Sequence, residues 1–204
     1  FNDYSLDSKI IYVRSRLRVI KFFLKSLNYG EFIKRIRSEG AIVEEFIEGE
    51  KKFSPSVQVM VSYDGEVEVI SSHEQVLDEG GMRFLGSRFP ASFCYRREIE
   101  RLGKVAGKAL KKHNIYGVFS VDFLVVQTAD SYDVSIIEIN IRKGGTTHPY
   151  WTSRYLLDAT KAEESGHLET TDGQKYLYRS NDNFQHLGNK DLSVERILSL
   201  AQEK

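Results

Sequence analysis

The stretch IIEINIRKGGTTHP, residues 136–149, joins an apolar run to closely spaced polar side chains and then to a glycine turn. Glu138 and Asn140 stand two residues apart, and Arg142 follows at the same spacing. Because side chains two apart on a β-strand point to the same face, these three groups share one face if the strand continues. The two glycines that follow allow a turn and the close approach of a ligand. The stretch therefore predicts a strand that ends in a polar site.

A second predicted strand brings another carboxylate to this site. The sequence predicts strands at 117–126 and 132–140, joined by a short polar loop. We expect Asp122 on the first strand to face Glu138 on the second. This register assumes that the two valines nearest the loop face each other: Val126 and Val134.

The expected cluster of oxygen atoms suits a divalent cation. Like charges that face each other in a sheet are destabilising unless something offsets them. The carboxylates of Asp122 and Glu138 and the amide oxygen of Asn140 are hard ligands of the kind that Mg²⁺ or Mn²⁺ prefers. Mg²⁺ usually fills its remaining positions with phosphate and water, and Arg142 is placed to contact a phosphate oxygen. A solvent-facing strand edge with scattered charges is the alternative interpretation.

Composition excludes several classes of protein. The 204 residues are 41% hydrophobic and 28% charged, which is typical of a folded globular chain. Lysine and arginine equal aspartate and glutamate at 29 each, so the whole-chain charge gives no reason to expect nucleic acid or a membrane as partner. The single cysteine, Cys94, excludes an internal disulfide, and we expect it to be a buried small residue. No run is apolar enough to span a bilayer, and a cytoplasmic location is expected.

The basic stretch at 9–27 has two interpretations. One is an amphipathic helix that binds an acidic or calmodulin-like protein partner. The other, which we favour, is a strand followed by a helix with solvated cations. The remaining expected elements are a helix at 31–38, a β-rich run at 41–49, a hairpin at 56–73, a loop at 78–92, a helix at 97–114, a helix after Trp151, a hairpin at 166–183 and a helix from Ser193.

The Asp122 strand followed by Glu138-x-Asn140-x-Arg142 resembles the metal-binding end of the ATP-grasp fold. The segment EINIRKGGTTHPY (138–150) is similar to the corresponding segment in the ATP-grasp group that contains the pheganomycin-type peptide ligase and the animal IQ motif-containing protein H. Further blocks of this group occur in order: GAIVEEFIEGEKKFSPSVQV (40–59), ISSHEQVL (70–77), FPASFCY (89–95), GVFSVDFLV (117–125) and YRSNDN (178–183). Thr147 stands where the biotin-dependent carboxylases of this fold carry an acid before His-Pro, so carboxylase activity is disfavoured.

The resemblance implies an α+β fold, the ATP-grasp C-terminal subdomain with a mainly antiparallel sheet and flanking helices. It implies that ATP and Mg²⁺ (or Mn²⁺) are bound and that a small carboxylate or peptide substrate is activated as an acyl phosphate for attack by an amine. The implied metal ligands are Asp122, Glu138 and Asn140, and the implied catalytic residue is Arg142. The implied nucleotide contacts are Glu44, Glu45, Phe46, Ile47 and Gln75. The implied acceptor contacts are Thr146, Thr147, His148 and His73.

For several of these residues an ordinary structural role is the alternative interpretation. Glu44 and Glu45 also fit a charged strand edge. Gln75 and His73 also fit an ordinary polar loop, and His148 also fits a structural hydrogen bond. By the same resemblance, residues 1–31 are a basic segment outside the family, 32–160 hold the linker strand and metal-binding subdomain, and 161–204 are an appended hairpin and helix.

The sequence departs from the family at its beginning. A complete ATP clamp needs a first subdomain with a glycine-rich loop, and residues 1–31 contain Gly30 alone. We therefore expect a piece of a longer protein that, in isolation, binds ATP weakly and turns over poorly, because an open clamp leaves the phosphates in water. The alternative is a non-catalytic nucleotide-binding or regulatory module of a larger IQ motif-containing protein H-like protein.

Overall fold

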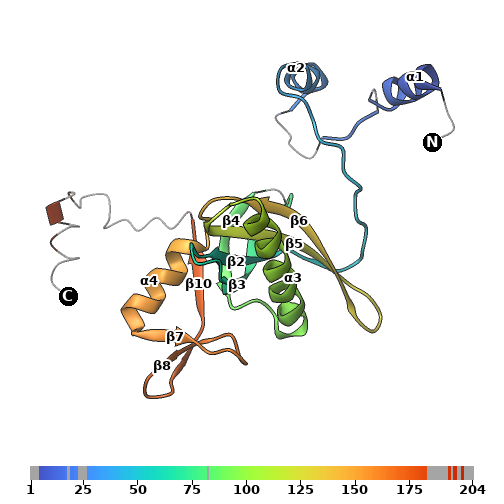
Figure 1. Cartoon of the computed structure of the whole chain (residues 1–204). Coiled ribbons are helices and arrows are strands. Elements are labelled where there is room, and N and C mark those ends of the chain that lie inside the picture. Colours follow the sequence, from blue (N-terminus) through green and yellow to red (C-terminus); the bar gives the residue numbers. More distant parts are fainter. Residues whose placement is uncertain are drawn as a thin grey trace. The chain divides into compact units, whose positions relative to one another are not determined.

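The computed structural model describes residues 5–17, 19–22, 27–81, 83–182, 193, 195–196 and 199. The chain forms two compact units, Phe1–Ile47 and Glu48–Lys204. The first unit contains the helices α1 (Leu6–Leu17) and α2 (Tyr29–Glu39), shown in Figure 1. Asn28 begins α2 with a capping box, because its side chain accepts from the backbone N–H of Glu31 while the Glu31 side chain reaches back to the Asn28 N–H. The helix predicted at 31–38 is thereby confirmed.

Two predictions for the first unit are wrong. The strand favoured for the start of 9–27 is helical through Leu17; residues 18 and 23–26 of that stretch lie outside the described residues. The β-rich run at 41–49 forms no strand, and Val43 is 96% exposed. A strand needs a hydrogen-bonded neighbour, and no strand of the described part of the chain pairs with this segment.

The second unit is built on one seven-stranded sheet. Its order is β1-β5-β2-β3-β4-β10, with β6 paired to β5, and every pairing is antiparallel. This arrangement confirms the predicted α+β class with a mainly antiparallel sheet. The strands are β1 (Lys52–Phe53), β2 (Pro55–Val61), β3 (Val67–Leu77), β4 (Phe84–Phe89), β5 (Gly117–Gln127), β6 (Tyr132–Asn140) and β10 (Tyr178–Asn181).

The sequence predicts some strands correctly and misses one. The hairpin at 56–73 is confirmed as β2 and β3, and the strands at 117–126 and 132–140 are confirmed as β5 and β6. The loop predicted at 78–92 is wrong, because Phe84–Phe89 forms β4 between β3 and β10. The loop prediction rested on Gly80, Gly81, Gly86 and Pro90. In the sheet, the β10 backbone lies so close to Gly86 that it leaves no room for a side chain there.

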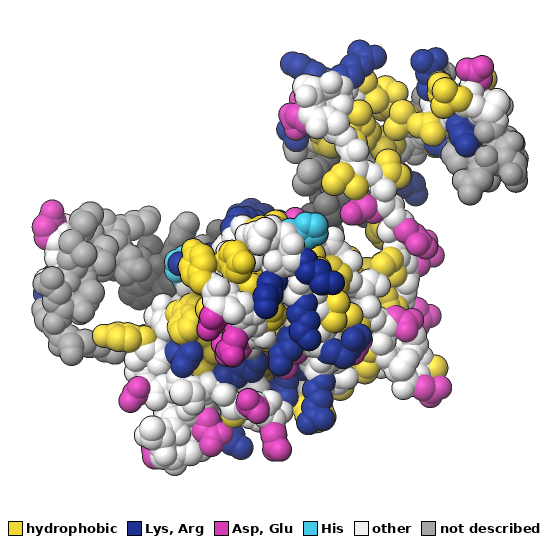
Figure 2. All heavy atoms as spheres, viewed as in Figure 1, with side chains coloured by type: hydrophobic (Ala, Val, Ile, Leu, Met, Phe, Trp, Pro, Cys, Tyr) yellow, Lys and Arg dark blue, Asp and Glu magenta, His cyan; other side chains and the backbone are white. Residues whose placement is uncertain are grey.

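The helix α3 (Phe93–Lys112) covers one face of the sheet. Its apolar side packs on a first core made by alternate residues of β2 and β5, among them Val57, Val59 and Phe119. Figure 2 shows lysine and arginine side chains gathered over this helix on its outer side. The helix predicted at 97–114 is confirmed, and it begins earlier because Ser92 caps it.

The opposite face of the sheet carries a second core. The helix α4 (Thr147–Leu157) contributes the buried Tyr150, which packs with Ile70 and Phe89. A three-stranded sheet of β7 (Ala159–Lys161), β8 (Leu168–Thr170) and β9 (Lys175–Tyr176) adds Leu168. The hairpin predicted at 166–183 is confirmed for β8 and β9, whereas β10 joins the main sheet.

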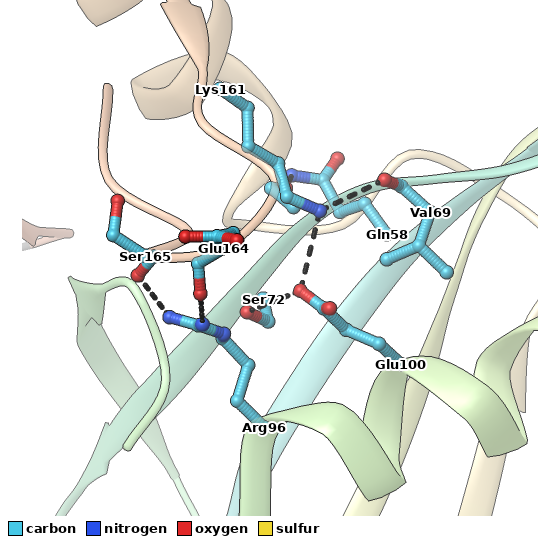
Figure 3. Close-up of polar contacts among 9 residues, drawn as sticks. Gln58, Val69, Ser72, Arg96, Glu100, Lys161, Glu164 and Ser165 are labelled. Atoms are coloured by element: carbon cyan, nitrogen blue, oxygen red, sulfur yellow. Dashed lines mark hydrogen bonds and ion pairs between the residues drawn. The ribbon is translucent and has the colours of Figure 1, made fainter. Parts of the chain in front are cut away.

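Partly buried polar contacts connect the small sheet and the turn after β7 to α3, as Figure 3 shows. Lys161 on β7 pairs with Glu100 on α3 at 3.2 Å and donates to the Val69 carbonyl oxygen at 3.2 Å. The Arg96 guanidinium on α3 donates to the carbonyl oxygens of Ser165 and Glu164. Because α4 and β7 adjoin in sequence, these contacts also fix the end of α4 against the sheet.

The predictions for Cys94 and for the helix from Ser193 can also be compared with the structure. Cys94 is exposed on the first turn of α3, so the prediction that it is buried is wrong; the turn directs Tyr95 rather than its neighbour into the core. The helix expected from Ser193 lies largely outside the described residues. Across the part of the chain that the structure describes, none of the helices combines the length and the apolar character needed to cross a bilayer.

Candidate functional site

Three neighbouring strands bring the predicted metal ligands together. Asp122 on β5 pairs with Glu138 on β6 and with Ser56 on β2. Asn140 pairs with Ser120, one step further along the same face. These side chains line a cavity of about 370 Å³. The full wall consists of Ser56, Gln75, Leu77, Phe84, Ser120, Asp122, Glu138, Asn140, Arg142, Gly144, Gly145, Thr146 and Asp182.

The predicted pairing of Asp122 with Glu138 is confirmed, but for a different reason than assumed. At the loop end, Val134 faces Val125 rather than Val126, so the assumed register is wrong there by one residue. The register shifts between Asp122 and Phe123, where β6 carries one extra residue. The extra residue brings Asp122 and Glu138 back opposite each other. Bulges are common next to functional sites, where they redirect side chains.

The carboxylate of Asp122 is the electrostatic centre of the cavity. Its two oxygens accept hydrogen bonds from the Ser56 hydroxyl at 2.6 Å and from the Asn140 amide nitrogen at 3.1 Å. Burial raises the pKa of Asp122, the Ser56 hydrogen bond opposes that rise, and repulsion from the facing Glu138 adds to it. Asp122 and Glu138 are therefore a facing pair of carboxylates whose repulsion a bound cation would relieve.

Arg142 stands at the rim just after β6 ends. Its guanidinium donates to the side-chain oxygen of Asn140 at 3.2 Å and to the carbonyl oxygen of Lys143 at 3.2 Å. The side chain is exposed and also lines the cavity, so it can reach a ligand inside it. Sequence spacing predicted this placement, although the strand itself stops at Asn140.

The glycine turn closes the other side of the cavity. A Cβ atom on Gly145 would lie 2.8 Å from the Phe84 ring, so only glycine lets the turn lie this close to β4. Thr147 accepts a hydrogen bond from the Gly144 N–H at 3.1 Å and begins α4. Thr146 is buried and lines the cavity, and its contact with an acceptor stays a prediction.

Sequence reasoning missed several residues of the wall. Ser56 and Ser120 are ordinary strand residues in the sequence, and their roles follow only from strand pairing. Asp182 belongs to the YRSNDN block, which carries the family resemblance but suggests no role by itself. Gln75, predicted as a nucleotide contact, does line the cavity.

Other predicted residues are not among those that line the cavity. Glu44, Glu45, Phe46 and Ile47 belong to the first unit, and their nucleotide contacts stay a prediction. His148 is exposed on the first turn of α4 and does not line the cavity. His73 is fully buried in the second core, where its Nε2 atom lies 2.9 Å from the Tyr178 hydroxyl.

The burial of His73 predicts a pH-dependent stability. Burial, together with the positive charge of Lys161, lowers the pKa of His73 from 6.5 to about 3. The neutral ring is therefore favoured by folding, and this contribution is complete above pH 6.5 and is lost as the pH falls toward 3. Between pH 7 and pH 5 the free energy of unfolding should decrease by about 2 kcal/mol from this group. Urea unfolding of wild type and His73→Gln at both pH values measures the effect; equal losses in the two proteins would contradict it.

Comparisons with known proteins identify related chains. A sequence model described as IQCH-like, ATP-grasp matches residues 21–144. L-propargylglycine–L-glutamate ligase from Streptantibioticus cattleyicolor is 36% identical over 148 residues, which is 72% of this chain and 29% of that ligase. The chain thus spans under a third of the length of this curated relative.

Solved structures give weaker matches. Biotin carboxylase from Campylobacter jejuni, solved as a β,γ-ATP complex, is 20% identical with a TM-score of 0.47, over 64% of this chain and 28% of that one. N5-carboxyaminoimidazole synthetase from Staphylococcus aureus, complexed with ADP, is 17% identical with a TM-score of 0.44, over 59% of this chain and 30% of that one.

Proposed function

The chain belongs to the IQCH-like ATP-grasp family, whose sequence model matches more than half of it, and from this membership we propose that its cavity binds ATP with a divalent cation. We further propose that the protein activates a small carboxylate or peptide as an acyl phosphate, which an amine then attacks. The similarity to a ligase named for joining propargylglycine to glutamate supports this class of reaction. The acid and the amine joined by this protein are then small amino acid-like molecules or peptides.

One observation carries the proposal: Asp122, Glu138, Asn140 and Arg142 line a single cavity. The ligand that fits this set has to provide positive charge for the carboxylates and negative charge for the guanidinium. A metal–polyphosphate complex provides both at once. A cavity of about 370 Å³ falls within the range of small-molecule sites.

The donor set fits Mg²⁺ or Mn²⁺. Asp122 and Glu138 would hold the ion through carboxylate oxygens. The amide oxygen of Asn140, which accepts a hydrogen bond from Arg142, would complete the protein's share through its second lone pair. Among the described residues no three or more His, Cys, Asp or Glu side chains are grouped as a metal site, and the proposed set has two carboxylates and one amide. Mg²⁺ commonly takes one or two protein carboxylates and leaves the rest to phosphate and water. When bound, the ion neutralises charge on the phosphates.

Arg142 would bind the phosphoryl group that is transferred. Phosphoryl transfer depends on positioning and on cations that meet the charge spread over the phosphoryl oxygens. Asn140 holds the guanidinium at the cavity rim through a hydrogen bond of 3.2 Å, so the charge is in position before a ligand arrives. Thr146 and the glycine turn then form the wall on which an acceptor lies.

We predict that Arg142→Ala lowers ADP release from Mg-ATP by the full-length protein about 100-fold, because one positioned donor to a developing charge contributes about this much. Lys143→Ala is the matched control, since it removes a neighbouring exposed cation that does not line the cavity. A coupled assay of ADP release measures both variants. Equal rates in the two variants would remove Arg142 from the proposed role. Retained Mg-ATP binding with no release in wild type would favour the non-catalytic module.

A further inference from the structure

The helix α3 has two sharply different sides. Tyr95, Ile99 and Ala106 point into the first core. On the opposite side, cations recur at alternating spacings of four and three residues, which places them on one line along the helix. We call this line the basic stripe, and its members are Arg97, Arg101, Lys104, Lys108 and Lys111.

The basic stripe concentrates charge on a chain that is neutral overall. The helix carries seven lysine and arginine residues against two glutamates, a net of five positive charges, whereas the chain as a whole has none. Arg101 pairs with Glu98 at 2.7 Å, and Lys111 donates to a carbonyl oxygen. Within the described part of the chain, Arg97, Lys104 and Lys108 have no ion-pair partner. Figure 2 shows the resulting column of dark blue side chains over α3.

Exposed aromatic rings lie at both ends of the stripe. Phe93, four residues before Arg97 and on the same line, is 71% exposed. At the other end Tyr63 is 92% exposed, and its ring stacks on that of Tyr116 with centroids 5.5 Å apart. Lys111 donates to the Gly65 carbonyl oxygen at 2.7 Å and so attaches the turn next to Tyr63 to the end of α3.

We propose that the basic stripe and its flanking aromatic rings bind single-stranded nucleic acid. The stripe from Arg97 to Lys111 is about 21 Å long, at about 1.5 Å per helical residue. A line of cations matches a phosphate backbone, and exposed aromatic rings stack on unpaired bases whatever the sequence. Duplex DNA keeps its bases stacked on one another and leaves the rings without a role. An acidic peptide would likewise use the cations and not the rings.

This surface is separate from the cavity. The cavity residues Ser56, Ser120 and Asp122 alternate along their strands with residues of the first core, so the cavity opens on the face of the sheet away from α3. The proposal therefore does not depend on ATP binding. It also explains how a chain with no net charge can have an anionic partner, because the charges are segregated on one helix.

The test is fluorescence anisotropy of the 204-residue chain with labelled dT20 and U20 between 50 and 200 mM NaCl. The affinity should fall by about 0.7 log units per log unit of salt for each phosphate neutralised. Four contacts give a slope of about 3, which is a loss of about 50-fold between 50 and 200 mM NaCl. Lys104→Glu with Lys108→Glu should lower affinity about 30-fold at 50 mM NaCl. The matched control, Lys34→Glu with Arg35→Glu on α2, changes net charge equally and should leave affinity within about 3-fold.

A second pair of measurements separates the alternatives. Tyr63→Ala with Phe93→Ala should lower affinity about 10-fold without changing the salt slope, because stacking is not an ionic contact. Circular dichroism checks that each variant is folded. Equal losses in the stripe and control variants would overturn the proposal, as would an unchanged affinity without the rings. Tighter binding of a labelled poly-glutamate peptide than of dT20 would also overturn it and would assign the stripe to an acidic protein.

Discussion

Glu138→Ala is expected to abolish Mg²⁺-dependent ADP release by the full-length protein, with a fall of at least about 1,000-fold. The side chain faces Asp122 across β5 and β6 and is one of the two carboxylates in the proposed ligand set. Without it, one carboxylate and one amide of the proposed ligand set remain to compete with water for the ion. Raising Mg²⁺ to tens of millimolar should restore part of the rate, because the substitution weakens a binding site without changing the fold.

Asp133→Ala is the matched control for Glu138. It removes an exposed carboxylate from the same strand, at the loop end where β6 pairs with Val126 and away from the cavity wall. Its rate of ADP release should stay within about 2-fold of wild type. If Glu138→Ala released ADP as fast as this control, the carboxylate pair would not be a metal site.

Gly86→Ala should cost at least about 3 kcal/mol of unfolding free energy. A Cβ atom at this position would lie 2.1 Å from the carbonyl oxygen of Ser180 on β10, and a backbone atom cannot move aside as a side-chain end can. Relief requires β4 and β10 to separate. That movement would also displace Asp182, which follows β10 and lines the cavity.

Gly173→Ala separates this clash from the general cost of replacing glycine. Gly173 has φ of +82° with open space around its Cβ position, so alanine there should cost about 1 kcal/mol through backbone strain alone. Urea unfolding followed by circular dichroism gives both values. Similar costs at the two positions would mean that β4 and β10 do not lie as close as the structure places them.

The site was predictable because its chemistry is local in sequence. The spacing of Glu138, Asn140 and Arg142 fixes which side chains share a face, and a single hairpin brings Asp122 to them. The same reasoning could not find the bulge at the centre of that hairpin, since a bulge depends on how two strands twist and not on residue type. The expected pairing of the carboxylates is correct even though the assumed register beside the loop is wrong.

The incorrect secondary-structure predictions concern segments whose structure depends on partners that are distant in sequence. The run at 41–49 has strong β-propensity, yet propensity forms a strand only where another strand pairs with it. The segment at Phe84–Phe89 contains a glycine and precedes a proline, yet it is a strand because β3 and β10 lie on either side of it. Neither outcome can be read from the local residues.

Whole-chain composition was least informative about partners. Equal numbers of acidic and basic residues predict no anionic partner, but the fold places five cations on one side of α3. The spacing of these cations can be read in the sequence of the helix predicted at 97–114. The sequence does not show that the opposite side of the helix is buried, which leaves these cations on its exposed side.

The most direct test of the metal–nucleotide site is a titration of the isotope-labelled 204-residue chain with ATP in the presence of trace Mn²⁺, followed by NMR. Paramagnetic broadening is confined to atoms near the ion, and it reports weak binding at millimolar nucleotide. The amide signals of Asp122, Glu138 and Asn140 should broaden first, and those of Lys104 and Lys108 on α3 should stay sharp. Broadening centred on α3, or the same broadening at Glu138 in the Asp122→Ala variant, would contradict the site described above.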